Sequence, residues 1–218
     1  MSLSFSKQWA GHLAKRTDQS HENEAVLAYV IEVLLINLLN ITVILTLGFL
    51  FNVLPEIITC MVTIAMLRFT AGGAHSNNPW RCAAVSAFVF LAIALLASYV
   101  SLVTRFYVDI LSVLAIVFCI VSVIRFAPVD SPSAPILSTT RRKRLKLLAL
   151  LVVLFITTII ILLRQLTWVY ANEIQAAVIL CTLWGSFNLT GSGHRLMTLI
   201  DNYFIPKKRG GDLREKNH

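Results

Sequence analysis

The sequence predicts an all-α, polytopic integral membrane protein. Of its 218 residues, 57% are hydrophobic and only 14% are charged, whereas soluble domains average about 25% charged residues. The apolar residues are gathered into about six long runs, which is the pattern of helices that cross a bilayer. The chain length allows a single membrane-embedded domain, predicted over residues 1–206, and a basic cytoplasmic tail at residues 207–218.

The N-terminal segment 2–16 places Leu3, Trp9 and Leu13 among cationic side chains. This arrangement predicts an amphipathic helix that lies in the membrane interface. It belongs to a cytoplasmic, interfacial N-terminus at residues 1–24. A mobile polar N-terminus is the alternative interpretation.

Six hydrophobic segments follow the N-terminus. They are expected at residues 28–52, 53–67, 83–103, 107–124, 145–163 and 171–189. The second segment is short against the roughly 20 residues that a spanning helix needs, and it starts with Pro55-Glu56. We therefore expect it to be either a short, tilted span or a re-entrant segment.

The distribution of basic residues predicts the orientation. If all six segments cross and the N-terminus is cytoplasmic, only Arg105 and Arg164 of the 19 lysines and arginines lie outside. The positive-inside rule favours this topology, with both termini and the loop after the second segment in the cytoplasm. Contact with anionic lipid explains the basic run 141–146, and docking of an acidic peptide is a second explanation. The net charge of +8 is therefore not interpreted as a nucleic-acid footprint.

A polar stretch, RFTAGGAHSNNPWRC, runs from Arg68 to Cys82 between the second and third segments. It holds His75 and Cys82, a candidate catalytic pair, because an imidazole can take the proton of a thiol. On a continuous helix, seven residues would separate the pair by roughly 10 Å along the axis. The chain must then fold back between them, and Asn77-Asn78-Pro79 suits such a reversal. An ordinary loop with an inert cysteine is the alternative.

Other residues of the polar loops are candidates for supporting roles. Gly72 and Gly73 offer a flexible or close-approach point whose backbone N–H groups could bind an oxyanion. Arg68 could stabilise a thiolate or hold a substrate carboxylate, as could Arg81. Asp130 could orient the imidazole, hold a basic substrate or serve as a solvated turn residue.

The remaining three cysteines do not suggest a site. Cys60, Cys119 and Cys181 lie inside hydrophobic runs, where a cysteine usually acts as a small buried hydrophobe. No cysteine or histidine cluster has zinc spacing, so neither a metal nor a disulfide framework is expected.

The residues of the polar stretch resemble the signature of the AgrB family, the accessory gene regulator membrane peptidases of Gram-positive quorum sensing. Arg68, Gly72-Gly73, His75 and a cysteine seven residues later fall into the places of that signature. The later APVDSPSAPI, with Asp130 and a basic run behind it, is similar to the family's second motif. The resemblance covers nearly the whole chain.

The resemblance implies a cysteine endopeptidase in the plasma membrane of a Gram-positive bacterium, without a cofactor. Cys82 would be the nucleophile and His75 the general base and acid. The substrate would be an AgrD-like precursor peptide, cut near its C-terminal end through an acyl-enzyme thioester and cyclised to a thiolactone or lactone. The acidic tail of such precursors would meet the basic residues of the second polar loop, which are Arg141, Arg142, Lys143 and Arg144. A homodimer is a further hypothesis.

Two other functions remain open from the residues. Glu32, Asn37, Asn40 and Glu56 could line a polar path in a membrane transporter or channel component, because polar groups inside a bilayer are costly. The chain could also be a non-catalytic membrane partner that docks an acidic peptide through its basic loops.

Overall fold

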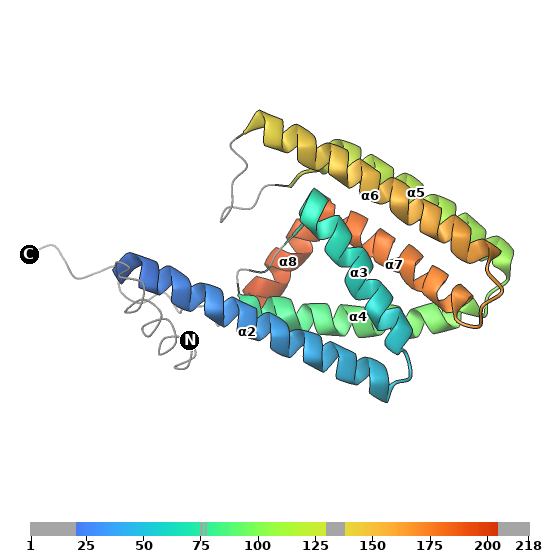
Figure 1. Ribbon diagram of the computed structural model, residues 1–218, viewed down its shortest axis with the longest axis horizontal. Coiled ribbons are helices and arrows are strands. Elements are labelled where there is room, and N and C mark those ends of the chain that lie inside the picture. Colours follow the sequence, from blue (N-terminus) through green and yellow to red (C-terminus); the bar gives the residue numbers. More distant parts are fainter. Residues whose placement is uncertain (1–20, 75, 77, 130–137, 205–218) are drawn as a thin grey trace, which may run out of the picture.

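The structure, a computed structural model, describes residues 21–74, 76, 78–129 and 138–204, and within these ranges it is helical without a strand (Figure 1). The helices are α2 (His21–Leu50), α3 (Leu54–Ala71), α4 (Pro79–Ser101), α5 (Arg105–Phe126), α6 (Thr139–Gln165), α7 (Ala171–Leu189) and α8 (Gly191–Phe204). The amphipathic segment 2–16, His75, Asp130 and the tail 207–218 lie outside the described residues.

The predicted fold class is confirmed. Helices α2 to α6 are long and apolar enough to cross a membrane, and α7 with α8 would make a sixth span that is bent by 82°. The short second segment is the continuous 18-residue helix α3, which at 1.5 Å per residue is about 27 Å long. The sharp bend therefore lies at the C-terminal end of the bundle and not in the second segment.

The structure corrects the predicted boundaries around the polar stretch. Helix α3 continues through Arg68 to Ala71, and α4 begins at Pro79, so that Cys82 is helical as well. Asn78 starts α4 by accepting a hydrogen bond from the Trp80 backbone N–H, and proline is well tolerated in a first turn. Both helices extend beyond their apolar runs into the polar stretch, because polar residues at a membrane boundary can still be helical. Hydropathy alone therefore placed the end of α3 and the start of α4 too far from this stretch.

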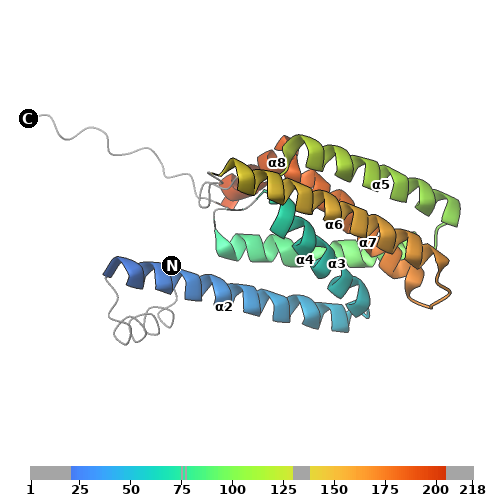
Figure 2. The same ribbon diagram turned by 45° about the horizontal axis from the view of Figure 1, so that its top comes forward.

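Helix α7 occupies the centre of the bundle. It packs against α3, α4, α5, α6 and α8, whereas α2 lies at one side against α3 and α4. Figures 1 and 2 both show α2 on one side and the α5–α6 pair on the other, with α7 between them. The helix is central even though it contains polar residues. Thr182 and Ser186 bond to backbone carbonyls one turn earlier in their own helix, which satisfies these hydroxyls inside the bundle.

Small side chains allow the central helices to approach closely. Ala97 of α4 and Ala176 and Ala177 of α7 are completely buried, together with Cys60 and Cys181. Lipid is as apolar as a leucine side chain, so helix association in a bilayer depends on close packing of such small residues. As predicted for cysteines in hydrophobic runs, Cys60, Cys119 and Cys181 are buried.

Three arginines mark the two ends of the bundle. Arg105 and Arg164, the two cations predicted to lie outside, line one small pocket together with Asp109. Arg164 donates a hydrogen bond of 2.7 Å to the Asp109 carboxylate. Arg81 lies at the opposite end, where it bonds to α8. Arg81 and the Arg105–Arg164 pair therefore lie at opposite ends of the bundle, and Arg164 is paired with an acid.

Helix α8 was not anticipated, because its segment is too polar for a span. It turns across the end of the bundle toward the start of α4 (Figure 1). Its inner face is formed by Gly193, Met197 and Asp201, which are spaced by four residues and buried. The sequence signal that would have revealed the helix is the recurrence of apolar residues at Leu196, Leu199, Ile200 and Tyr203.

We predict that Ala97→Leu destabilises the bundle, whereas Ala92→Leu does not. Ala97 is fully buried against α3 and α7, and overpacking of a tight core costs about 1–3 kcal/mol. Ala92 is exposed on the same helix, so a leucine there faces lipid. Thermal unfolding in detergent measures both variants, and equal melting temperatures would contradict the packing described for α4 and α7.

Candidate functional site

A pocket lies where α3 ends and α4 begins, and it gathers four of the predicted site residues. Arg68, Gly72, Gly73 and Cys82 all line it. The other lining residues are mostly apolar and come from α3, α4, α7 and α8; they are Ile64, Leu67, Ala74, Val85, Ser86, Val89, Phe90, Trp184, Gly185, Asn188 and Met197. The pocket is small, with a volume of about 40 Å³.

Backbone hydrogen bonds fix the loop after α3 at the edge of this pocket. The Val129 N–H donates to Ala71 O at 2.9 Å, and the Ala74 N–H donates to Asn188 O at 3.0 Å. The loop is thereby joined both to the segment after α5 and to the end of α7. Arg68 adds a third restraint, because its guanidinium donates to Ala74 O at 3.0 Å. Arg68 therefore helps to shape the loop in addition to lining the pocket.

Gly72 is required by this close approach. Its φ of +79° is one that residues with a side chain rarely adopt. A Cβ at this position would also lie 2.7 Å from Val129 O. The N–H groups of Gly72 and Ala74 already donate to the Arg68 and Asn188 carbonyls, so neither is available to an oxyanion in this conformation.

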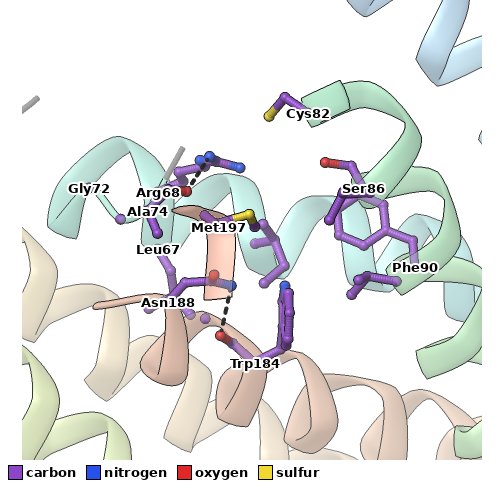
Figure 3. Close-up of a pocket in the computed structure, with 15 residues that line it drawn as sticks. Leu67, Arg68, Gly72, Ala74, Cys82, Ser86, Phe90, Trp184, Asn188 and Met197 are labelled. Atoms are coloured by element: carbon purple, nitrogen blue, oxygen red, sulfur yellow. Dashed lines mark hydrogen bonds between the residues drawn. The ribbon is translucent and has the colours of Figure 1, made fainter. Parts of the chain in front are cut away.

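Cys82 differs from the other three cysteines in its surroundings. It lies in the first turn of α4, half-buried and facing the pocket, whereas Cys60, Cys119 and Cys181 are completely buried. Figure 3 shows its sulfur turned toward the pocket, with Arg68 on the α3 side. The first turn of a helix favours negative charge nearby, which suits a reactive thiolate.

The α7 side of the pocket holds a polar group that sequence analysis missed. Asn188 donates from its side-chain amide to Trp184 O at 3.0 Å (Figure 3). Its Oδ1 atom is buried and has no hydrogen-bond partner in the described structure. A buried acceptor without a partner costs free energy unless a ligand supplies a donor. The signal in the sequence is an amide at the end of an otherwise apolar run.

The remaining predicted site residues are not part of this pocket. Arg141, Arg142, Lys143 and Arg144 are exposed in the first two turns of α6, at the same end of the bundle as the pocket (Figure 1). The next cation, Lys146, donates to Ile124 O of α5 at 2.6 Å and so caps that helix. His75 and Asp130 lie outside the described residues, so the proposed pairing of His75 with Cys82 stays a prediction.

Among the described side chains, no three His, Cys, Asp or Glu residues gather closely enough to hold a metal ion.

Arg81, a second candidate anion-binding group, donates to Asp201 O of α8 at 2.8 Å. It lies at the rim of the site but does not line the pocket. The chemistry that this pocket can support is therefore that of a thiol next to apolar surface, an arginine and an amide.

Fold and pocket together define a multi-pass helical membrane protein with one accessible cysteine at the end of its bundle. The family model for accessory gene regulator B matches residues 6–189. The chain is also 27% identical over 206 residues to an AgrB-like protein of Clostridium perfringens strain SM101, and 28% identical over 205 residues to AgrB-like protein 2 of strain 13. Each match covers 91% of this chain and 96% of the relative. No solved structure matches the chain.

The chain belongs to the AgrB family, a membrane family of the accessory gene regulator system. The family match ends at residue 189, which is the last residue of α7. Helix α8, with Met197 in the pocket, therefore lies beyond the matched region.

We predict that Gly72→Ala lowers the stability of the protein by more than about 1 kcal/mol, because it combines an unfavourable φ with a steric clash. Gly191→Ala is the matched control, since a Cβ there meets no atom within 4 Å. Thermal unfolding in detergent compares the two variants. Equal stability would show that the loop does not hold the close contact with Val129.

Proposed function

We propose that the protein is a membrane cysteine endopeptidase that processes the precursor of a signal peptide. The observation that carries the proposal is the position of Cys82, which is the one cysteine of the four that is not fully buried and lines the pocket. Membership of the AgrB family supports an AgrD-like peptide as the substrate. The proposed catalytic domain spans residues 1–206.

In the proposed reaction, the Cys82 thiolate attacks a backbone carbonyl carbon near the C-terminal end of the precursor. The C–N bond then breaks, and His75 transfers the proton of the thiol to the leaving amine. The products are a released tail with a free amino group and an acyl thioester on Cys82. A thiol or hydroxyl of the bound peptide then gives its proton to His75 and attacks the acyl carbon; the bond between this carbon and the Cys82 sulfur breaks, which closes the ring and releases Cys82 as a thiolate.

The pocket supports the second half of this reaction by its lining. Phe90, Trp184 and Met197 bring apolar surface close to Cys82, which lowers the access of water to a thioester. Hydrolysis would compete with ring closure if water reached the acyl group freely. We further propose that Asn188 Oδ1 accepts a hydrogen bond from a precursor N–H, because it is buried and unpartnered at this place.

The basic turn of α6 supports the proposed recognition of an acidic tail. Cations at a helix N-terminus oppose the helix dipole, so the dipole of α6 gives no reason for the four cations at residues 141–144. They are exposed and lie at the same end of the bundle as the pocket (Figure 1). We propose that this end faces the cytoplasm, where the basic turn meets both anionic lipid and the acidic part of the precursor.

The transporter hypothesis has less support from the geometry. Glu32, Asn37 and Asn40 all lie on α2, which packs at the side of the bundle. They line neither the Cys82 pocket nor the pocket of Arg105 and Arg164. Glu56 is buried at the start of α3, but it is likewise not among the residues of either pocket.

The proposal predicts that Cys82→Ser and His75→Ala each abolish cleavage of a precursor encoded beside the gene. Reconstituted protein is mixed with the precursor, and mass spectrometry follows the cleaved tail, the ring and an acyl adduct on Cys82. The triple variant Cys60→Ala/Cys119→Ala/Cys181→Ala is the control, and it should retain cleavage because its substitutions lie away from the pocket. Failure to detect cleavage or adduct with a validated precursor would overturn the assignment.

A second prediction concerns the basic turn. Replacing Arg141, Arg142, Lys143 and Arg144 together by glutamine should raise KM about tenfold or more and leave kcat unchanged, because each exposed ion pair contributes up to about 1 kcal/mol. The wild-type KM should rise with salt, and the variant should lose this dependence. Glutamine replacement of Lys207, Lys208 and Arg209 is the control for the loss of positive charge elsewhere in the chain. An unchanged KM would exclude steering by the α6 turn.

A further inference from the structure

Helix α8 packs back onto the end of α7 and reaches the candidate site from beyond residue 189, where the match to the family model ends. A Cβ at Gly193 would lie 2.4 Å from Phe187 O and 2.8 Å from the Asn188 Cα. The glycine therefore permits a contact that no larger residue would allow, and α8 can turn by 82° directly after α7. One turn later Met197 lines the pocket, and Asp201 follows on the same buried face.

Asp201 is a buried carboxylate, with 5% of its surface exposed. The Ser76 hydroxyl donates to its Oδ1 atom at 2.5 Å. The Arg81 guanidinium donates to its backbone carbonyl at 2.8 Å and lies 3.8 Å from Oδ1. A carboxylate is rarely buried unless such partners compensate for the lost water. The three residues therefore form a specific junction and not an incidental surface contact.

The two partners of Asp201 flank the candidate catalytic pair in the sequence. Ser76 directly follows His75, and Arg81 directly precedes Cys82. Between them, the Ser76 hydroxyl also accepts a hydrogen bond from the Asn78 N–H at 3.3 Å, and the Asn78 side chain caps α4. Asp201 thus contacts a residue on each side of this turn: its carboxylate accepts a hydrogen bond from Ser76 and forms an ion pair with Arg81, and its backbone carbonyl accepts a hydrogen bond from Arg81.

We propose that Asp201 is a positioning residue that fixes the turn from Ser76 to Arg81 and thereby aligns His75 with Cys82, an inference that rests on the proposed peptidase function. Asp201 does not line the pocket, so it acts through its neighbours and does not touch the substrate. Seven residues of a continuous helix would keep the pair roughly 10 Å apart. The junction with α8 restrains Ser76 and Arg81, the two described residues that stand next to His75 and Cys82 in the sequence.

The test measures the resting thiol separately from catalysis. In the Cys60→Ala/Cys119→Ala/Cys181→Ala background, iodoacetamide reacts with Cys82 alone, and its rate reports how strongly a nearby base activates the thiol. Asp201→Ala should slow this reaction at neutral pH by roughly tenfold or more, toward the rate of His75→Ala. The double variant His75→Ala/Asp201→Ala should be no slower than His75→Ala, because both changes remove the same interaction.

Cleavage assays supply the second readout. Asp201→Ala should lower kcat by roughly 10²-fold with little change in KM, because misalignment affects the reacting groups and not the binding of the precursor. Asn202→Ala is the matched control, since the neighbouring side chain is exposed, and it should behave like the wild type. Asp201→Asn keeps the size of the side chain and an acceptor for Ser76, so it should retain the fold and lie between the wild type and Asp201→Ala.

The outcomes separate this inference from the proposed function. If Asp201→Ala, or Asp201→Asn where the alanine variant does not fold, keeps wild-type alkylation and kcat, the positioning role is wrong. The positioning role is also wrong if His75→Ala/Asp201→Ala is alkylated more slowly than His75→Ala, because the two substitutions would then remove different interactions. If the alkylation results hold but the wild type cleaves no precursor, the peptidase assignment fails while the link between Asp201 and the thiol stands.

Discussion

The arrangement of the candidate site depends on one junction of three backbones. Ala71 accepts a hydrogen bond from Val129, and Ala74 donates one to Asn188, so the loop after α3 is tied to the ends of α5 and α7. This is possible only because residue 72 has no side chain. With the loop held there, the pocket forms between this loop, the start of α4 and the end of α7, which are distant in the sequence.

The position of α7 determines what this junction can hold. In a bilayer there is little hydrophobic gain from bringing two apolar helices together, so contact depends on side-chain size and on satisfied polar groups. Ala176 and Ala177 let the neighbouring helices approach, and the hydroxyls of Thr182 and Ser186 bond within their own helix. Asn188, at the end of α7, is the exception. Its unpartnered oxygen stays in the pocket, where a donor from a bound molecule would relieve its cost.

Much of this architecture was accessible from the sequence, because a bilayer imposes a simple rule on it. Every spanning segment must satisfy its backbone internally and present apolar side chains to lipid, so composition and run length predicted a helical, multi-pass protein with the right segments. The same signal misplaced the ends of α3 and α4, since hydropathy falls at the membrane boundary while the helix continues. Mean hydropathy also gave no sign of α8, because its segment mixes polar with apolar residues and is too polar for a span. The motif residues Arg68, Gly72, Gly73 and Cys82 could be named in advance because they stand within 15 residues of one another.

What the sequence alone determined is the class of fold, the family signature and the likeness of its cysteine motif to a catalytic one, because these depend on local composition and spacing. The tertiary structure alone decided that Cys82 shares a pocket with Asn188 and Met197, and that Asp201 meets Ser76 and Arg81. These contacts join residues more than 100 positions apart, and no local pattern encodes them. They arise because α7 passes through the centre of the bundle and α8 folds back over its end.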